Sequence, residues 1–302
     1  MKNINKNSNN LNCYIKLLPL LIFISIFSIY PSFYAINLSF KEYKLVLPPP
    51  YGYVGFSNYL NLFKDSYFIQ SFFNTIWFAI ACVLFVTILG FFTAILLNNT
   101  FRGVNILRTA IFLPWTVPYV TTGILWKLFF MSGWGYLTKI INTFGLLEAG
   151  TSIAWLSNDF VAKFAIVLAQ VWHEFPLATI FFLSGLQTIP EELYEAIDLE
   201  SRSVFHKLRF ITIPLLKPVF AIVIILNTIL AITTFDVVYV ITGGGPAGKT
   251  SLLSYYAHSK AFRFLDFGEG SAISMVLTAV TIIVVIIVFK ITAERNQMGE
   301  TN

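Results

Sequence analysis

Six stretches of the chain are long, apolar and almost free of charge, and they restrict its fold more than any other feature. Each comes near the roughly 20 residues that a helix needs to cross the hydrocarbon core of a bilayer. They cover residues 17–40, 72–97, 104–126, 164–189, 218–235 and 271–289. Because backbone polar groups in lipid must be paired within the protein, these stretches predict an all-α integral membrane fold with six transmembrane helices.

The composition agrees with lipid as the main surroundings of the chain. Hydrophobic residues make up 57% of its 302 residues and charged residues 12%, whereas soluble domains carry about 25% charged residues. This excludes a soluble enzyme and an intrinsically disordered chain. The charged residues, which give a net charge of +5, lie mostly between the apolar stretches. This distribution fits membrane flanks better than a nucleic-acid-binding surface. Two cysteines, Cys13 and Cys82, are too few for a disulfide framework.

The distribution of Lys and Arg favours a cytoplasmic N-terminus, and an even number of spans then places both termini in the cytoplasm. The first apolar stretch is longer than the roughly 7–15 residues of a signal-peptide core, so we interpret it as an uncleaved span. The predicted spans are residues 17–40, 72–97, 104–130, 164–189, 218–240 and 271–289. The outer loops are 41–71, 131–163 and 241–270. The cytoplasmic parts are a leader (1–16), the inner loops 98–103 and 190–217, and a tail (290–302).

The inner loop 190–217 carries a clear helix signal outside the spans. Pro190 stands at an expected first helical position, and Glu191 and Glu192 follow in the first turn, where acidic side chains favour a helix. A short amphipathic helix is predicted here. From composition alone it could be a solvated helix that lies on lipid headgroups.

The same loop resembles the EAA loop of ATP-binding-cassette (ABC) importer permeases, in the form found in maltose-type carbohydrate importers. The resemblance rests on Tyr194, Glu195, Ala196 and Ile197, followed without gaps by the run ITIPLLKP at 211–218. Ile197 replaces the usual second Ala, and Ser201 stands where the family usually has Gly. Further stretches that resemble motifs of this family lie at residues 54–59, 108–115, 183–190, 235–246 and 262–268.

The resemblance implies the first permease subunit of such an importer, with the type I architecture and no enzymatic activity of its own. It implies a coupling helix that docks on a cytoplasmic ATPase through Glu195, Ala196, Ile197 and Ser201. The implied partners are a second permease subunit, two ATPase subunits that carry ATP and Mg²⁺, an extracytoplasmic sugar-binding protein and the lipid bilayer. No cofactor is expected on this chain, no nucleic acid is expected as a partner, and the expected cargo is a sugar such as maltose or trehalose.

One motif points to a different function. Residues 243–250, GGGPAGKT, satisfy the G-x-x-x-x-G-K-[ST] phosphate-loop pattern at every position. A phosphate loop needs a parallel α/β sheet around it, and the chain has no soluble stretch long enough for one. We therefore interpret the segment as a glycine-rich outer loop.

Polar residues at membrane depth are the candidates for a substrate pathway, because an unpaired polar group there is costly. They are Trp172, Glu174, Asn227 and Asp236, with a helix break expected at Pro176. The competing interpretations are structural pairing between helices, a position near a membrane face for Glu174 or Asp236 and, from the family motif, a structural or gating role for Asp236. His173 beside Glu174 also leaves open a self-contained secondary transporter with a His/Glu relay. A third hypothesis, a membrane enzyme, lacks the paired acidic or metal-binding residues that it needs.

Overall fold

The computed structural model describes residues 16–145, 153–200 and 203–300, and over these ranges the chain is helical with two isolated antiparallel bridges. The all-α prediction is confirmed for this part of the chain. The chain divides into two compact units, Met1–Lys64 with Ala257–Met275 and Asp65–Tyr256 with Val276–Asn302. The last helix, α15 (Phe267–Glu300), begins in the first unit and continues into the second.

Four helices are long and apolar enough to cross a bilayer. They are Lys16–Ser39, α4 (Ser66–Asn98), α8 (Asp159–Leu186) and the Phe267–Lys290 part of α15. They match the first, second, fourth and sixth predicted stretches. A fifth candidate is the pair Val204–Leu215 and Lys217–Thr233, whose two helices meet at an angle of 69°. Six unbroken spans are not found in the described ranges, because the third and fifth predicted stretches are each interrupted.

The helices α4 and α8 each begin at a side chain that caps the first turn. The Asp65 carboxylate accepts a hydrogen bond from the backbone N–H of Tyr67 (2.9 Å). Asn158 Oδ1 accepts from the N–H groups of Phe160 and Val161 (3.0 and 3.1 Å). These caps satisfy donors that a first helical turn leaves unpaired. They explain why both helices start several residues before the apolar stretches.

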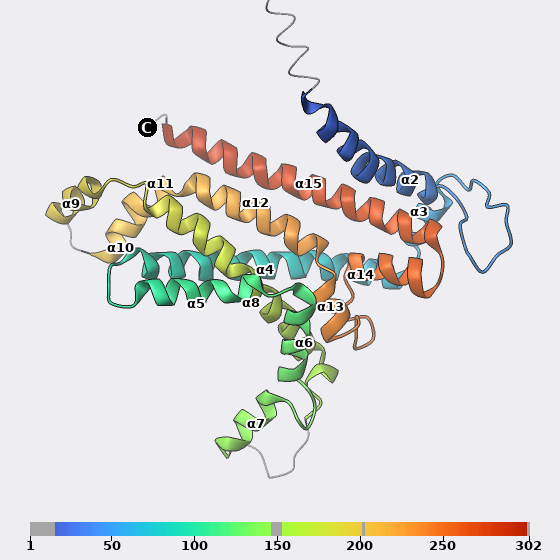
Figure 1. The fold of residues 1–302 in the computed structure, drawn as a ribbon, viewed down its shortest axis with the longest axis horizontal. Helices are drawn as coiled ribbons and strands as arrows, with labels where there is room; N and C mark the ends of the chain where they lie inside the picture. Colours follow the sequence, from blue (N-terminus) through green and yellow to red (C-terminus); the bar gives the residue numbers. More distant parts are fainter. Residues whose placement is uncertain (1–15, 146–152, 201–202, 301–302) are drawn as a thin grey trace, which may run out of the picture. The chain divides into compact units, whose positions relative to one another are not determined.

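The helices α4, α8 and α12 (Lys217–Thr233) form the packed centre of the second unit (Figure 1). Phe78, Phe182 and Ile232 are fully buried in this core. At Gly90, α4 comes so close to α8 that an added Cβ would lie 2.7 Å from the Cβ of Ala178. Small residues at such contacts let helices approach closely in a membrane, where the hydrophobic effect does not hold them together.

The third predicted span, 104–130, is two helices. The first, α5 (Val104–Thr116), ends before Pro118, and α6 (Tyr119–Phe129) then runs in a different direction (Figure 1). Proline has no N–H and disfavours a helical backbone in the residue before it, and Val117 has φ −80° and ψ 129°. The third predicted span is therefore interrupted before Pro118.

Other prolines leave their helices intact. Pro114 lies inside α5 and Pro176 lies inside α8, which continues to Leu186. The break that we predicted at Pro176 does not occur. A membrane helix tolerates such prolines where neighbouring groups satisfy the freed carbonyls.

The fifth predicted span, 218–240, is also interrupted. The helix α12 ends at Thr233, and α13 (Asp236–Ile241) follows after two non-helical residues. The carbonyl of Thr234 accepts a hydrogen bond from the hydroxyl of Ser254 in α14 (Leu253–His258). No proline lies at this break, so the sequence does not predict it. The remaining elements of this unit are α7 (Tyr136–Thr143), η2 (Trp155–Ser157), α9 (Glu191–Glu200), α10 (Val204–Lys207), η3 (Leu208–Thr212) and α11 (Ile213–Leu215).

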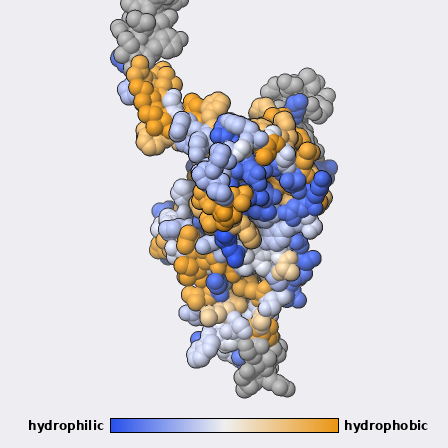
Figure 2. Space-filling model, turned by 90° about the vertical axis from the view of Figure 1, so that its right-hand side faces the viewer, coloured by the Kyte–Doolittle hydropathy of each residue, from blue (hydrophilic) through white to orange (hydrophobic). Residues whose placement is uncertain are grey.

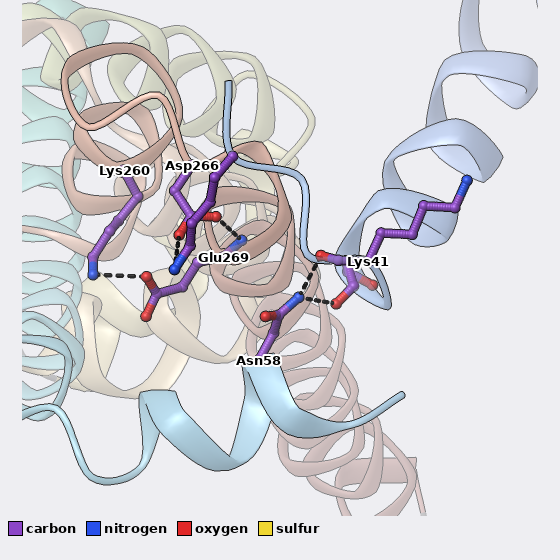
Figure 3. A network of polar contacts seen from close by, with 7 residues as sticks. Lys41, Asn58, Lys260, Asp266 and Glu269 are labelled. Carbon is purple, nitrogen blue, oxygen red and sulfur yellow. Dashed lines mark hydrogen bonds and ion pairs between the residues drawn. The ribbon is translucent and has the colours of Figure 1, made fainter. Parts of the chain in front are cut away.

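The first unit ties the segment after the N-terminal helix to the residues around the start of α15 (Figure 3). The side-chain amide of Asn58 donates to the carbonyls of Ser39 (2.8 Å) and Lys41 (3.0 Å). Lys260 Nζ lies 2.8 Å from Glu269 Oε2. The helical elements of this unit are η1 (Ser25–Ile29), α2 (Tyr30–Ser39), α3 (Ser57–Leu62), η4 (Ser259–Arg263) and the first residues of α15.

An ion pair joins Lys44 to Asp266 in the same unit, with Nζ and Oδ2 3.2 Å apart. Partial burial is the largest single effect and lowers the pKa of Lys44, but the carboxylates of Asp266, Glu269 and Glu42 together raise it by more, so the pKa lies above its ordinary value. A lysine with a raised pKa keeps its charge at every pH below that value. Lys44 is therefore charged at neutral pH.

Large apolar side chains cover much of the helix surface. Phe27 is 65% exposed, Phe73 65%, Ile80 64% and Phe289 60%. Figure 2 shows broad hydrophobic areas on the face in view. Soluble proteins rarely expose apolar patches of this extent, whereas lipid or further membrane helices would cover them.

Candidate functional site

Two cavities lie at the breaks of the interrupted spans. The larger, of about 440 Å³, lies at the break between α5 and α6, and its wall includes Trp115, Val117, Tyr119, His173, Glu174 and Leu230. The smaller, of about 130 Å³, lies at the break between α12 and α13, and its wall includes Tyr119, Leu230, Thr233, Thr234 and Asp236. Tyr119 and Leu230 line both cavities, so the two share a wall. The larger volume falls within the roughly 300–1,000 Å³ of sites for small molecules.

A cluster of three side chains closes the break between α5 and α6. His173 Nε2 lies 2.9 Å from the carbonyl of Val117, and the imidazole stacks on the ring of Tyr119 with centroids 4.0 Å apart. The hydroxyl of Tyr119 donates to Glu174 Oε1. Because a carbonyl only accepts, Nε2 must carry the proton. His173 thus pairs the carbonyl that precedes Pro118.

Glu174 and His173 lie side by side, with their Oε1 and Nδ1 atoms 3.2 Å apart. Because Nε2 already carries a proton toward Val117, a hydrogen bond between Oε1 and Nδ1 requires a second proton, on the imidazole or on the carboxyl group. The other oxygen of Glu174, Oε2, is buried and has no hydrogen-bond partner in the described part of the chain.

The structure brings two of the four predicted pathway residues to these cavities. Glu174 lines the larger cavity and Asp236 the smaller one. Trp172 instead packs edge-on against Trp126, with centroids 6.1 Å apart. Asn227 donates to the carbonyl of Val223 in its own helix (2.9 Å). Neither Trp172 nor Asn227 is part of the cavity walls just described.

Sequence reasoning missed Tyr119 and Trp115 as wall residues. Both are aromatic residues in an apolar stretch, where such residues are common. The available signal was Pro118, which interrupts the helix next to them and exposes their side chains to the cavity.

The segment after α8 forms the predicted amphipathic helix, α9, which begins one residue after Pro190. Two contacts tie it to the following segment. The Tyr194 hydroxyl lies 3.1 Å from Thr212 Oγ1, and Lys207 Nζ donates to Asp198 Oδ2 (2.7 Å). These contacts hold one side of α9 and leave its other side uncovered.

The predicted docking residues fall on different sides of α9. Glu195 and Ala196 are exposed, whereas Ile197 is half-buried. Ser201 lies outside the described residues. Leu199, which we did not single out, is 91% exposed and lies four residues after Glu195, on the same side of the helix. The uncovered face is therefore formed by Glu195, Ala196 and Leu199.

The glycine-rich loop at 243–250 pairs its own hydrogen-bonding groups with each other and with flanking residues. A phosphate loop holds phosphate through free backbone N–H groups and binds Mg²⁺ through a Ser or Thr hydroxyl. Here the hydroxyl of Thr250 donates to the carbonyl of Gly245 (2.6 Å). Nearby oxygens also accept hydrogen bonds from five backbone N–H groups of the loop, which belong to Gly243, Gly244, Gly245, Lys249 and Thr250.

Glycine is needed in this loop for steric reasons. Gly244 has φ +81°, and a Cβ there would lie 2.7 Å from the ring of Tyr255. Gly248 has φ +77°, and a Cβ there would lie 2.6 Å from the ring of Tyr67. Both contacts and both dihedral angles exclude a side chain. The loop therefore supports the structural interpretation of the motif.

A Lys249→Ala substitution tests this interpretation. Lys249 is exposed, and we expect the variant to keep the free energy of unfolding of the parent within about 0.5 kcal/mol, the usual range for exposed substitutions. Photolabelling of the purified chain with an ATP analogue, before and after the substitution, is the measurement. Labelling of the parent chain that disappears in the variant would contradict a structural loop.

Metal binding finds no support in the described ranges, where no three His, Cys, Asp or Glu side chains lie close enough to hold an ion.

Comparison with known proteins identifies relatives over most of the chain. The trehalose/maltose transport system permease protein MalF of Thermococcus litoralis is 37% identical over 276 residues, which are 91% of this chain and 91% of that protein. The sulfoquinovosyl glycerol transport system permease protein SmoG of Agrobacterium fabrum is 32% identical over 275 residues, 91% of this chain and 88% of that protein. The sn-glycerol-3-phosphate transport system permease protein UgpA of Yersinia pestis is 30% identical over 92% of both chains. These relatives are transport permeases rather than enzymes, as predicted for this chain.

The fold also matches a solved structure. A chain in the crystal structure of a bacterial alginate ABC transporter, in complex with an alginate pentasaccharide-bound periplasmic protein, superposes with a TM-score of 0.84. The match covers 98% of this chain and 99% of that chain at 18% identity, so it concerns the fold alone. The family described as binding-protein-dependent transport system inner membrane component matches residues 87–296. With more than half of the chain matched, and relatives above 30% identity over nine-tenths of it, this protein belongs to that family of inner-membrane transport permeases.

Proposed function

We propose that this chain is one permease subunit of an ABC importer that carries a sugar into the cytoplasm. The observation that carries the proposal is the pair of cavities at the two interrupted spans, in a chain of this family. Polar groups from α6, α8 and α13 converge there inside an otherwise apolar helix core. Irregular backbone at membrane depth is tolerated where it lines a cavity, and in transporters it often forms the binding site.

The proposed topology has six spans at the predicted positions, with the third and fifth interrupted. Both termini then lie in the cytoplasm, and the chain is a multi-pass protein of the cell membrane. Lys and Arg support this orientation, since 11 of the 20 fall on the inner side. They are Lys2, Lys6, Lys16, Arg102, Arg108, Arg202, Lys207, Arg209, Lys217, Lys290 and Arg295.

The proposed energy source is ATP hydrolysis on partner subunits. The exposed face of α9 supports this, because a tethered helix with an uncovered side is suited to enter a groove on another protein. Two ATPase subunits with ATP and Mg²⁺, a second permease subunit and an extracytoplasmic sugar-binding protein complete the proposed complex. A partner that binds one permease conformation better than the other can drive the change between them.

The proposed cargo is a neutral disaccharide such as trehalose or maltose. Support comes from the relative MalF, which is named for these two sugars and matches over nine-tenths of both chains. Aromatic faces at Trp115 and Tyr119 in the cavity wall suit the C–H faces of a sugar ring.

Reconstitution tests the whole proposal. The chain is tagged, purified in mild detergent with the proteins that accompany it, and placed in proteoliposomes with ATP inside and a sugar-binding protein outside. We expect a second permease and an ATPase at stoichiometric levels, and trehalose or maltose uptake that requires ATP. Uptake driven by a proton gradient without ATP would instead favour the His173–Glu174 relay, and recovery of the chain alone would contradict an importer subunit.

A further inference from the structure

The polar groups in the cavity walls are mostly hydrogen-bond acceptors. The hydroxyls of Thr116, Thr233 and Thr234 donate their protons to carbonyls of their own helices, at 2.8 Å in each case. The Tyr119 hydroxyl donates to Glu174. A hydroxyl that has given its proton away still accepts through its lone pairs. These four groups therefore present oxygen atoms rather than protons to a ligand.

Glu174 adds a further acceptor to the cavity wall. Its Oε1 accepts from the Tyr119 hydroxyl and lies 3.2 Å from His173 Nδ1, which leaves Oε2 as the oxygen with free lone pairs. Glu174 is 2% exposed, and Oε2 has no partner in the described chain. A buried unpaired acceptor is costly, so a ligand donor at this position would be stabilised.

Asp236 adds a second carboxyl group to the site. It is the first residue of α13 and lines the smaller cavity. No hydrogen-bond partner for this carboxyl group is found among the described residues. The residues that line the two cavities include neither Lys nor Arg, and both ring nitrogens of His173 are engaged. A phosphate, sulfonate or carboxylate in this site would meet acceptors and a like charge.

We propose that this cavity discriminates by charge: it binds neutral, hydroxyl-rich sugars and excludes anionic ones, with Glu174 and Asp236 as the specificity-determining residues. Glu174 Oε2 accepts a sugar hydroxyl, and Asp236 repels an anion. This inference rests on the proposed function. The family does not fix the outcome, because the relatives described above include a permease named for glycerol 3-phosphate, an anion.

The test compares trehalose with trehalose 6-phosphate, which differ only in the charged group. Binding is measured by saturation-transfer NMR on the complete complex in lipid nanodiscs, without the sugar-binding protein, so that only the membrane part selects. For the parent complex we expect affinity for trehalose to exceed affinity for its phosphate by about tenfold or more, since like-charge contacts cost several kcal/mol. Asp236→Asn and Glu174→Gln should each bring that ratio closer to one.

An Asp159→Asn variant is the matched control. Asp159 is an exposed carboxylate at the start of α8, the helix that carries Glu174, so the variant removes the same charge outside the cavity. The control should keep the parent ratio. Equal binding of both sugars by the parent complex, no binding of trehalose, or an unchanged ratio in both cavity variants would overturn the inference.

Failure of the proposed function gives a different result. In proteoliposomes with the binding protein and ATP, a complex that is not a sugar importer would take up neither sugar. If the complex takes up trehalose, but both variants keep the parent ratio of affinities for trehalose and trehalose 6-phosphate, the proposed importer function stands. Only the role of the two carboxyl groups is then contradicted.

Discussion

A Glu195→Lys variant is expected to take up sugar at least about a hundredfold more slowly than the parent complex, since like-charge contacts at an interface cost several kcal/mol. The contacts of Tyr194 and Asp198 hold α9 by one side and leave Glu195 on the uncovered side. If that side enters an ATPase groove, reversing the charge weakens the contact that transmits ATP-driven movement. Uptake into proteoliposomes and basal ATPase activity are measured together, and we expect only uptake to collapse.

The control for this variant is Asp159→Lys, a charge reversal at an exposed carboxylate at the opposite end of the 28-residue helix α8. It should retain most of the uptake. Leu199→Asp is a second probe of the uncovered face, because Leu199 is 91% exposed and an apolar anchor there would not tolerate a charge. Normal uptake by Glu195→Lys in a fully assembled complex would show that this face of α9 does not couple the two reactions.

We expect that a Gly90→Leu variant does not fold. A Cβ at Gly90 would lie 2.7 Å from the Cβ of Ala178 and 3.2 Å from the backbone of Ala178 and Thr179. Backbone atoms cannot move aside as the end of a flexible side chain can, so α4 and α8 must separate. Overpacking typically costs about 1–3 kcal/mol, and here it also disrupts the central contact of the helix core. The measurement is the yield of monodisperse protein in detergent and its thermal unfolding midpoint.

Gly52→Leu is the matched substitution. Gly52 is exposed, and a Cβ there would meet no atom within 4 Å. We expect its yield and unfolding midpoint to equal those of the parent chain. A Gly90→Leu protein as stable as Gly52→Leu would mean that the close approach of α4 and α8 does not hold the core together.

The long helices were predictable because their cause is local. An uncharged stretch of the right length forms a helix in lipid whatever its neighbours, and this holds for Lys16–Ser39, α4, α8 and the apolar part of α15. The effect of individual prolines was not predictable. Pro114, Pro118 and Pro176 look alike in the sequence, yet only Pro118 ends a helix. Whether a proline ends a helix depends on the packed structure, and at the break before Pro118 the carbonyl of Val117 is paired by His173, 56 residues away.

The site was predictable to the extent that polarity in an apolar stretch is visible. Glu174 and Asp236 were found in this way, and both line cavities. Trp172 and Asn227 have the same appearance in sequence, but their side chains face Trp126 and their own helix. The direction of a side chain on a membrane helix follows from which neighbours pack against it. One chain without an alignment does not contain that information.

The two interruptions in the spans are each secured by a side chain from another helix. His173 of α8 holds the carbonyl of Val117, and Ser254 of α14 holds that of Thr234. A hinge needs backbone groups that exchange partners at little cost, and these two carbonyls are already satisfied. We therefore expect the bends to persist throughout a transport cycle, with the pieces on either side moving as rigid bodies. Movement between these rigid pieces, rather than bending at the proline, would then open and close the pathway.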